Sequence, residues 1–275
     1  MLKNYIVGAA CLALVGFNIE NAQAGDSAFL DSIGLGGPWV VTAKGNIIVS
    51  PKWSGADKYT PIAFPSFSLR RPGEAPIWSS PDDSISYRMP INEIFSVGPV
   101  ITYRSGRYTG GNRELTGIHD VRWTLEPGLF LQAWIVPDVL RARIEIRRGF
   151  RDKDGFVADI GADWVNRIGA LSLGIGPRVS IADGSYMRDR YGVTFQDAAL
   201  NGQVTPFRPT SGIQSAGVYG SAGYQFNEQW SGTLHGGYSR LVGDAADSPI
   251  IRRFGDKDQW VFGASAGYSF NFSGF

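Results

Sequence analysis

Apolar and polar side chains alternate with a period of two over several long stretches of the chain. From Leu140 the sequence reads Leu-Arg-Ala-Arg-Ile-Glu-Ile-Arg, which places aliphatic side chains on one face and ionic side chains on the other. Because successive side chains of a strand point to opposite faces, this alternation predicts a β-strand. The pattern recurs from Phe156, from Leu171 and from Trp260. The predicted fold class is therefore all-β.

Eleven segments carry this alternation in a strong or weak form. They are 38–50, 60–70, 84–90, 94–104, 126–136, 139–149, 155–165, 169–182, 213–226, 229–242 and 258–273. Most are about ten residues long, the length that a tilted strand needs to cross the hydrocarbon core of a membrane. Because bacterial barrels have even strand numbers, we expect about twelve antiparallel strands, with one more strand within 72–84 or 190–205. The alternative is ten strands, with 84–90 as a loop.

Two architectures fit the alternation. A soluble sandwich would bury the apolar face and expose the arginines, whereas a transmembrane β-barrel turns the apolar face toward lipid and the ionic face inward. Aromatic residues at the ends of strands, such as Trp230, Tyr238 and Trp260, and the terminal Phe275 favour the barrel. We therefore expect a transmembrane barrel over residues 38–275.

The ionic face of such a barrel lines its interior. The rows predicted to face inward consist of Arg141, Arg143, Glu145, Arg147, Asp159, Asp163 and Arg178. Because buried charges need partners of opposite sign, we expect these side chains to form a lattice of ion pairs across neighbouring strands. The alternative is that the arginines select anions in an open pore.

The first residues have the pattern of an export signal. Lys3 precedes an apolar run over 6–17, and Ala22-Gln23-Ala24 follows as a small-x-small cleavage site. We expect a cleaved signal peptide over 1–24 and a periplasmic segment over 25–37. The single cysteine, Cys11, lies within the predicted signal, so no internal disulfide is expected.

The predicted connections alternate in length. Short turns at Pro137-Asp138, 166–169 and 227–229 alternate with long polar segments over 105–122, 184–212 and 243–258. We expect the short turns on the periplasmic side and the long segments outside the cell.

Charge and residue types restrict the chemistry. Lys and Arg number 26 against 25 Asp and Glu, so the chain has no basic field for nucleic acid. The two histidines, His119 and His235, are far apart and lack ligand spacing, so no metal or other cofactor is expected. His119-Asp120 near Glu114 leaves open an enzyme at the outer rim, but no motif marks a nucleophile, and no catalytic residue is expected.

Three segments resemble the MipA/OmpV family of outer-membrane proteins. The first is 53–59 with Pro61 and Pro65, the second is 176–193, and the third, which is the most specific, is Arg-Leu-Val-Gly-Asp-Ala-Ala-Asp-Ser-Pro-Ile-Ile over 240–251. The residues that carry the resemblance include Gly55, Asp57, Asp183, Tyr186, Gly243, Asp244, Asp247, Ser248 and Pro249. The third segment is expected to form turns in which the Asp side chains bond to local backbone amides.

The resemblance implies a barrel in the outer membrane of a Gram-negative bacterium. The family's best-known member resembles a scaffold that links a lytic transglycosylase to a murein synthase, and other members look like adhesins, antigens or porin-like channels. No catalytic residue is attached to the family. We therefore expect a non-enzymatic scaffold whose partners are outer-membrane lipid and these two periplasmic murein enzymes. The alternative is a small porin-like channel or adhesin barrel with a charged lumen.

Overall fold

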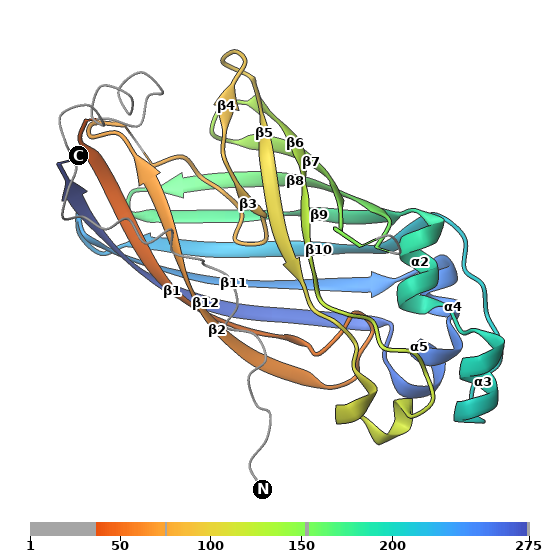
Figure 1. Ribbon diagram of the computed structural model, residues 1–275. Helices are drawn as coiled ribbons and strands as arrows, with labels where there is room; N and C mark the ends of the chain where they lie inside the picture. Colours follow the sequence, from red (N-terminus) through yellow and green to blue (C-terminus); the bar gives the residue numbers. More distant parts are fainter. Residues whose placement is uncertain (1–36, 75, 152–153, 274–275) are drawn as a thin grey trace, which may run out of the picture.

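The computed structural model describes residues 37–74, 76–151 and 154–273. The predicted signal peptide over 1–24, nearly all of the segment over 25–37, and Phe275 lie outside the described residues. Twelve strands form one antiparallel sheet in the described part of the chain (Figure 1). They are β1 (Trp39–Pro51), β2 (Tyr59–Arg70), β3 (Ile85–Ser86), β4 (Met89–Pro90), β5 (Phe95–Arg104), β6 (Thr124–Val136), β7 (Leu140–Arg148), β8 (Phe156–Ile168), β9 (Leu171–Ala182), β10 (Gly212–Gln225), β11 (Trp230–Leu241) and β12 (Asp258–Phe272).

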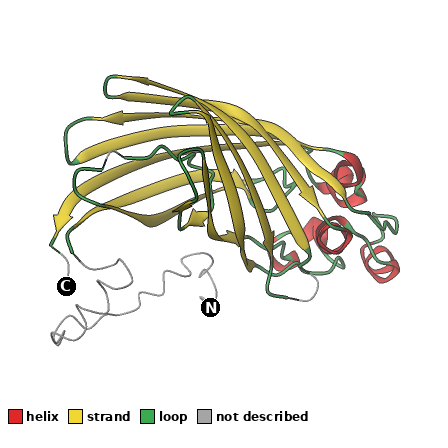
Figure 2. Cartoon of the chain, turned by 90° about the horizontal axis from the view of Figure 1, so that it is seen from above, coloured by secondary structure: helices red, strands yellow, loops and turns green. Residues whose placement is uncertain are grey.

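The first and last long strands of the sheet pair with each other. From β5 to β12 each strand pairs with the next, and β12 then pairs with β1, which pairs with β2. Figure 2 shows that this sheet curls into the wall of a half-barrel, and the described ladders leave it open between β2 and the short strands β3 and β4. The predicted all-β antiparallel class is confirmed.

The strand count is twelve only if β3 and β4 are included, and each of these has two residues. The ten long strands begin and end within three residues of the predicted segments. The expectation of another strand within 72–84 or 190–205 is wrong. Residues 72–74 and 76–84 are irregular, since Pro72, Pro76 and Pro81 cannot donate to a ladder. Residues 195–201 form a helix instead.

The two faces of the wall differ as predicted by the alternation. On β7, Arg141, Arg143 and Arg147 are buried on the inner face, whereas Ile146 on the opposite face is 51% exposed. Large apolar side chains of other strands, among them Trp164 and Phe262, are exposed in the same way. A soluble sandwich would bury the apolar face and expose the arginines, so this burial pattern contradicts that alternative.

The longer connections gather at one end of the wall and fold into short helices (Figure 1). These are α2 (Gly184–Tyr191), α3 (Phe195–Asn201), α4 (Gly243–Asp247) and α5 (Pro249–Phe254), with 3-10 turns η2 (Thr109–Gly111) and η3 (Arg113–Leu115). We call this end the cap. Asp183 and Thr194 accept hydrogen bonds from the first turns of α2 and α3, and Pro249 begins α5, which explains where these helices start.

The cap contains the main cluster of buried apolar side chains among the described residues. Its members include Trp53, Leu115, Tyr186, Met187, Tyr191, Ile250 and Ile251. The opposite end carries the short turns 137–139, 169–170 and 226–229, and β1 begins and β12 ends there. The predicted division into short and long connections is therefore present, except that the long connection between β2 and β3 starts at the end with the short turns.

No helix in the described ranges is long and apolar enough to span a membrane.

Candidate functional site

The inner face of β7, β8 and β9 carries one half of an ionic lattice centred on Asp163. This carboxylate is 1% exposed and lies opposite Arg141 in the β7–β8 ladder. Its two oxygens accept hydrogen bonds from Arg141 Nη2 at 2.7 Å and from Arg178 Nη2 at 2.6 Å. One buried carboxylate on β8 therefore holds an arginine from each neighbouring strand.

The other half of the lattice is centred on Glu145 and Arg147. Glu145 lies directly opposite Asp159 in the ladder, a placement of like charges that would be unfavourable alone. Arg147 removes the repulsion because it donates hydrogen bonds to both carboxylates. Arg143 Nε donates to Glu145 at 2.8 Å, and Arg104 Nε on β5 donates to Glu126 on β6 at 2.6 Å.

The irregular segment 77–84 lies between β2 and β3 in the sequence and contributes side chains to the lattice. Asp83 pairs with Arg141, and Asp82 pairs with Arg178. Trp78 packs edge-on against Trp134, with ring centroids 6.5 Å apart, and the Arg141 guanidinium lies over the Trp78 ring. The sequence analysis missed this segment, which places two further carboxylates and a large aromatic ring against the inner wall.

The structure places all seven residues of the predicted ionic rows in contact with charged partners. With the residues that the sequence analysis missed, the lattice has five arginines and six carboxylates, and every arginine has a carboxylate partner. Its members are Arg104, Arg141, Arg143, Arg147, Arg178, Asp82, Asp83, Glu126, Glu145, Asp159 and Asp163. Such pairing compensates the buried charges, while Arg143 Nη2 and Arg147 Nε donate no hydrogen bond to any described residue.

The histidines lie in two separate environments. His119 Nδ1 lies 2.8 Å from Asp197 Oδ2 on α3, so its carboxylate partner is not the adjacent Asp120. Glu114 pairs with Lys58, and Asp120 accepts hydrogen bonds from Thr109. The three residues weighed as an outer-rim enzyme site therefore have separate partners.

His235 lies on the inner face of β11. Its Nδ1 is 2.6 Å from the Tyr219 hydroxyl on β10, and the two rings stack. Within the described ranges, no group of three or more His, Cys, Asp or Glu side chains could hold a metal ion.

The family hallmark segments meet in the cap. Gly55 has a φ of +98°, and a Cβ there would lie 2.2 Å from Ile251 Cδ1, so the loop needs glycine both for its backbone angle and for the close approach of α5. Its N–H donates to Gln259 Oε1 on β12. Ser248, fully buried, donates to the Tyr191 carbonyl at 2.7 Å. Segments far apart in the chain thus hold one another through single hydrogen bonds.

The expected role of the aspartates in turns is wrong for Asp244. Residues 243–247 and 249–254 form two helices, and Asp244 accepts hydrogen bonds from the Thr210 N–H and hydroxyl in a different connection. These hydrogen bonds lower the pKa of the Asp244 carboxyl. Asp57 and Asp247 are exposed. Asp183 caps α2. Gly243 begins α4, and Pro249 begins α5 after the single intervening residue Ser248.

Arg107 is a buried cation of the cap that no pattern in the sequence indicated. It is 3% exposed, donates to the Arg190 carbonyl, and lies over the Trp53 ring. Burial lowers the pKa of this guanidinium to about 10. Its contacts come from parts of the chain distant in sequence, so local periodicity could not place it.

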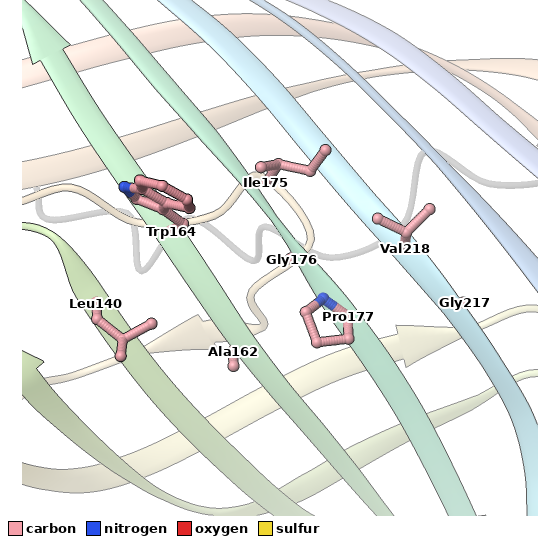
Figure 3. A pocket seen from close by; sticks show the side chains of 8 residues that line it. All are labelled: Leu140, Ala162, Trp164, Ile175, Gly176, Pro177, Gly217 and Val218. Atoms are coloured by element: carbon pink, nitrogen blue, oxygen red, sulfur yellow. The ribbon is translucent and has the colours of Figure 1, made fainter.

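The outer face of the wall has a shallow apolar groove (Figure 3). It is lined by Leu140, Ala162, Trp164, Ile175, Gly176, Pro177, Gly217 and Val218. None of these side chains is ionisable, so the groove offers apolar contact and no acid, base or nucleophile.

Comparison with known proteins gives one family and several distant solved structures. The family model described as MltA-interacting protein MipA matches residues 45–270. No curated protein sequence matches the chain. A KdgM porin is 11% identical with a TM-score of 0.38, and the match covers 84% of this chain and 99% of the porin.

Two further solved structures resemble the chain to a similar degree. The COG4313 outer membrane channel from Pseudomonas putida F1 is 10% identical with a TM-score of 0.44, over 86% of this chain and 96% of the channel. A NanC porin is 9% identical with a TM-score of 0.40, over 84% and 98%. At these identities and scores, the likeness carries no argument about function.

Proposed function

Because the chain belongs to the family of MltA-interacting proteins, we propose that it is an outer-membrane β-barrel that binds partner proteins and carries out no reaction itself. The exposed apolar side chains of the long strands would face lipid, and the ionic lattice would face the interior. The proposed location is the outer membrane of a Gram-negative bacterium, after cleavage of a signal peptide over 1–24. The segment 25–37 and the short turns would then face the periplasm.

The observation that carries the proposal is the covered inner face of β6 to β9. The inner face of β6 to β9 is covered by paired charges and by the segment 77–84, and the cap packs an apolar core at one end of the wall. A solute channel needs an open path with binding groups that are free to exchange ligands. A barrel with its inner charges already paired is better suited to present its two ends to other proteins.

The proposed partners are a lytic transglycosylase of the MltA type and a murein synthase, held together at the periplasmic end. The name of the family supports the first partner, and the sequence resemblance supports both. A direct test is a pull-down in which the folded barrel captures purified MltA. The matched control is the same chain unfolded by boiling.

We expect saturable capture of MltA by the folded barrel and none by the boiled chain. Addition of a purified murein synthase should then give a ternary complex. Absence of capture under conditions in which the barrel remains folded would contradict the scaffold proposal.

A porin-like channel is the second candidate, supported by the charges along the inner wall. In planar bilayers, the scaffold proposal predicts no discrete conductance from the folded wild-type protein. Discrete current steps that change in ion selectivity with Arg143→Ala would support the channel instead. An adhesin would use the cap, whose connections are the longest, and would predict binding to host-cell surfaces that is lost on proteolysis of the cap.

A further inference from the structure

Two consecutive carboxylates of the chain meet two arginines of the wall in forked geometry. Asp83 accepts hydrogen bonds from Arg141 Nη1 at 2.5 Å and from Nη2 at 2.8 Å. Asp82 accepts from Arg178 Nε at 2.7 Å and from Nη2 at 3.1 Å. Two parallel N–H···O bonds to one carboxylate are the arrangement by which arginine recognises carboxylate ligands.

The segment that carries these carboxylates is fastened to the wall through side chains. Its recorded backbone-to-backbone hydrogen bond, from Asp83 N to Ser80 O, lies within the segment itself. Ser84 contacts Glu145 and Thr102 through side-chain oxygens. Residues 77–84 add no strand to the described ladders, so their displacement would leave the pairing of β5 to β9 intact.

Without this segment, the inner wall has an excess of positive charge at this point. Arg141, Arg143 and Arg178 would face only Asp163 and Glu145 as contacting carboxylates. Arg143 is 7% exposed, and its Nη2 has no hydrogen-bond partner among the described residues. A buried donor without a partner is costly, and an additional carboxylate oxygen would satisfy it.

From these contacts we propose that Arg141, Arg143 and Arg178 form a binding site for a small polycarboxylate anion, which the chain's own Asp82 and Asp83 occupy. The segment 77–84 is thus an internal ligand that an external anion of the same chemistry can replace. This inference does not rest on partner binding, because the site lies on the inner wall and needs no second protein.

A tethered ligand competes strongly with a free one. A short flexible connection gives its groups an effective concentration in the millimolar range, so a free anion must exceed this concentration or bind more tightly. The wild-type site should therefore bind external polycarboxylates weakly. Removal of the two negative charges from the segment should reveal the site.

The test uses citrate as the probe and isothermal titration calorimetry on the detergent-folded protein. The informative variant is Asp82→Asn/Asp83→Asn, which preserves side-chain shape and removes both charges. Glu74→Gln is the matched control, since Glu74 lies in the same connection but accepts a hydrogen bond from the Arg71 N–H and pairs with no lattice residue in the described part of the chain.

We expect the double variant to bind citrate at least tenfold more tightly than the wild type, and Glu74→Gln to behave as the wild type. Adding Arg178→Gln to the double variant should reverse the gain. The site is refuted if the folded double variant binds within twofold of the wild type, or if its gain survives Arg178→Gln.

A second measurement keeps the test independent of how well the double variant folds. Ser80 is buried in the docked segment, and a chain that begins at Gly25 has no cysteine. Maleimide should label Ser80→Cys several-fold faster in citrate than in sodium chloride of equal ionic strength. Equal labelling rates in the two salts would overturn the proposal.

Discussion

The wall and the cap are stabilised by opposite distributions of side chains. In the wall, the buried side chains are largely ionic and the exposed ones largely apolar, as Arg141 and Trp164 illustrate. In the cap, the buried side chains are mainly apolar, as Tyr186 and Ile250 illustrate. An introduced charge at an exposed position should therefore be costly in the wall and nearly neutral in the cap, because the surroundings of the two surfaces differ.

The largest expected effect comes from breaking the lattice at Asp163. Asp163→Ala would leave Arg141 and Arg178 without their shared wall carboxylate and should cost about 3–5 kcal/mol of unfolding free energy. Guanidinium titration of the refolded protein measures this. Glu114→Ala is the control, since the Glu114 side chain is largely exposed and its carboxylate lies 3.4 Å from Lys58 Nζ, and it should change little. Equal effects of the two substitutions would contradict the importance of the lattice.

A positive charge introduced on the outer face of the wall should destabilise the protein more than the same charge on the surface of the cap. Ile144→Arg, near the middle of β7, should cost about 2–4 kcal/mol if that face contacts lipid. The same change at the exposed Leu200 on α3 should be nearly neutral, because that side chain would face water. Folding into lipid vesicles at increasing urea compares the two. An unchanged yield for Ile144→Arg would mean that the faces are assigned the wrong way round.

A smaller and local effect is expected within the cap. Ser248→Ala removes the donor to the buried Tyr191 carbonyl and should cost about 1–3 kcal/mol of cap stability. Hydrogen exchange should become faster in α2 and α5 and stay constant in the strands of the wall. Faster exchange throughout the wall would show that the two regions unfold as one unit.

The smallest effect concerns pH. Hydrogen bonds from Thr210 lower the pKa of Asp244 in the folded cap, so the stabilisation is fully present above the unfolded pKa of about 3.9 and is lost as pH falls through the folded pKa. The Thr210 amide chemical shift should titrate with a midpoint below 3.9. Asp244→Asn should abolish this titration. A midpoint at or above 3.9 would contradict the contact.

The strands were predictable because their signal is local. Alternation over about ten residues indicates both the boundaries and the inner face, so the positions of Arg141, Arg143 and Arg147 followed directly. The segment 77–84 was not predictable in this way, since its charged partners lie about 60 to 100 residues away and its proline, Pro81, cannot donate to a ladder. One hint existed: the predicted inner rows held four arginines but three carboxylates.

The cap was the least predictable region. Its helices have five to eight residues, and they form because loops from four connections bury Ile251, Tyr186 and their neighbours together. The hallmark around 243–249 was visible in the sequence, but the hydrogen bonds that Thr210 donates to Asp244 join residues 34 positions apart. The family resemblance identified the hallmark residues, and only the tertiary arrangement shows what they contact.

The central claim, that this chain forms a stable barrel in the outer membrane, is tested most directly by heat-modifiability on a gel. Outer-membrane fractions of cells that express the full chain are run with and without boiling. The account predicts that the protein is found in this fraction and that the unboiled form migrates differently from the boiled form. A soluble periplasmic protein with the same mobility in both samples would contradict it.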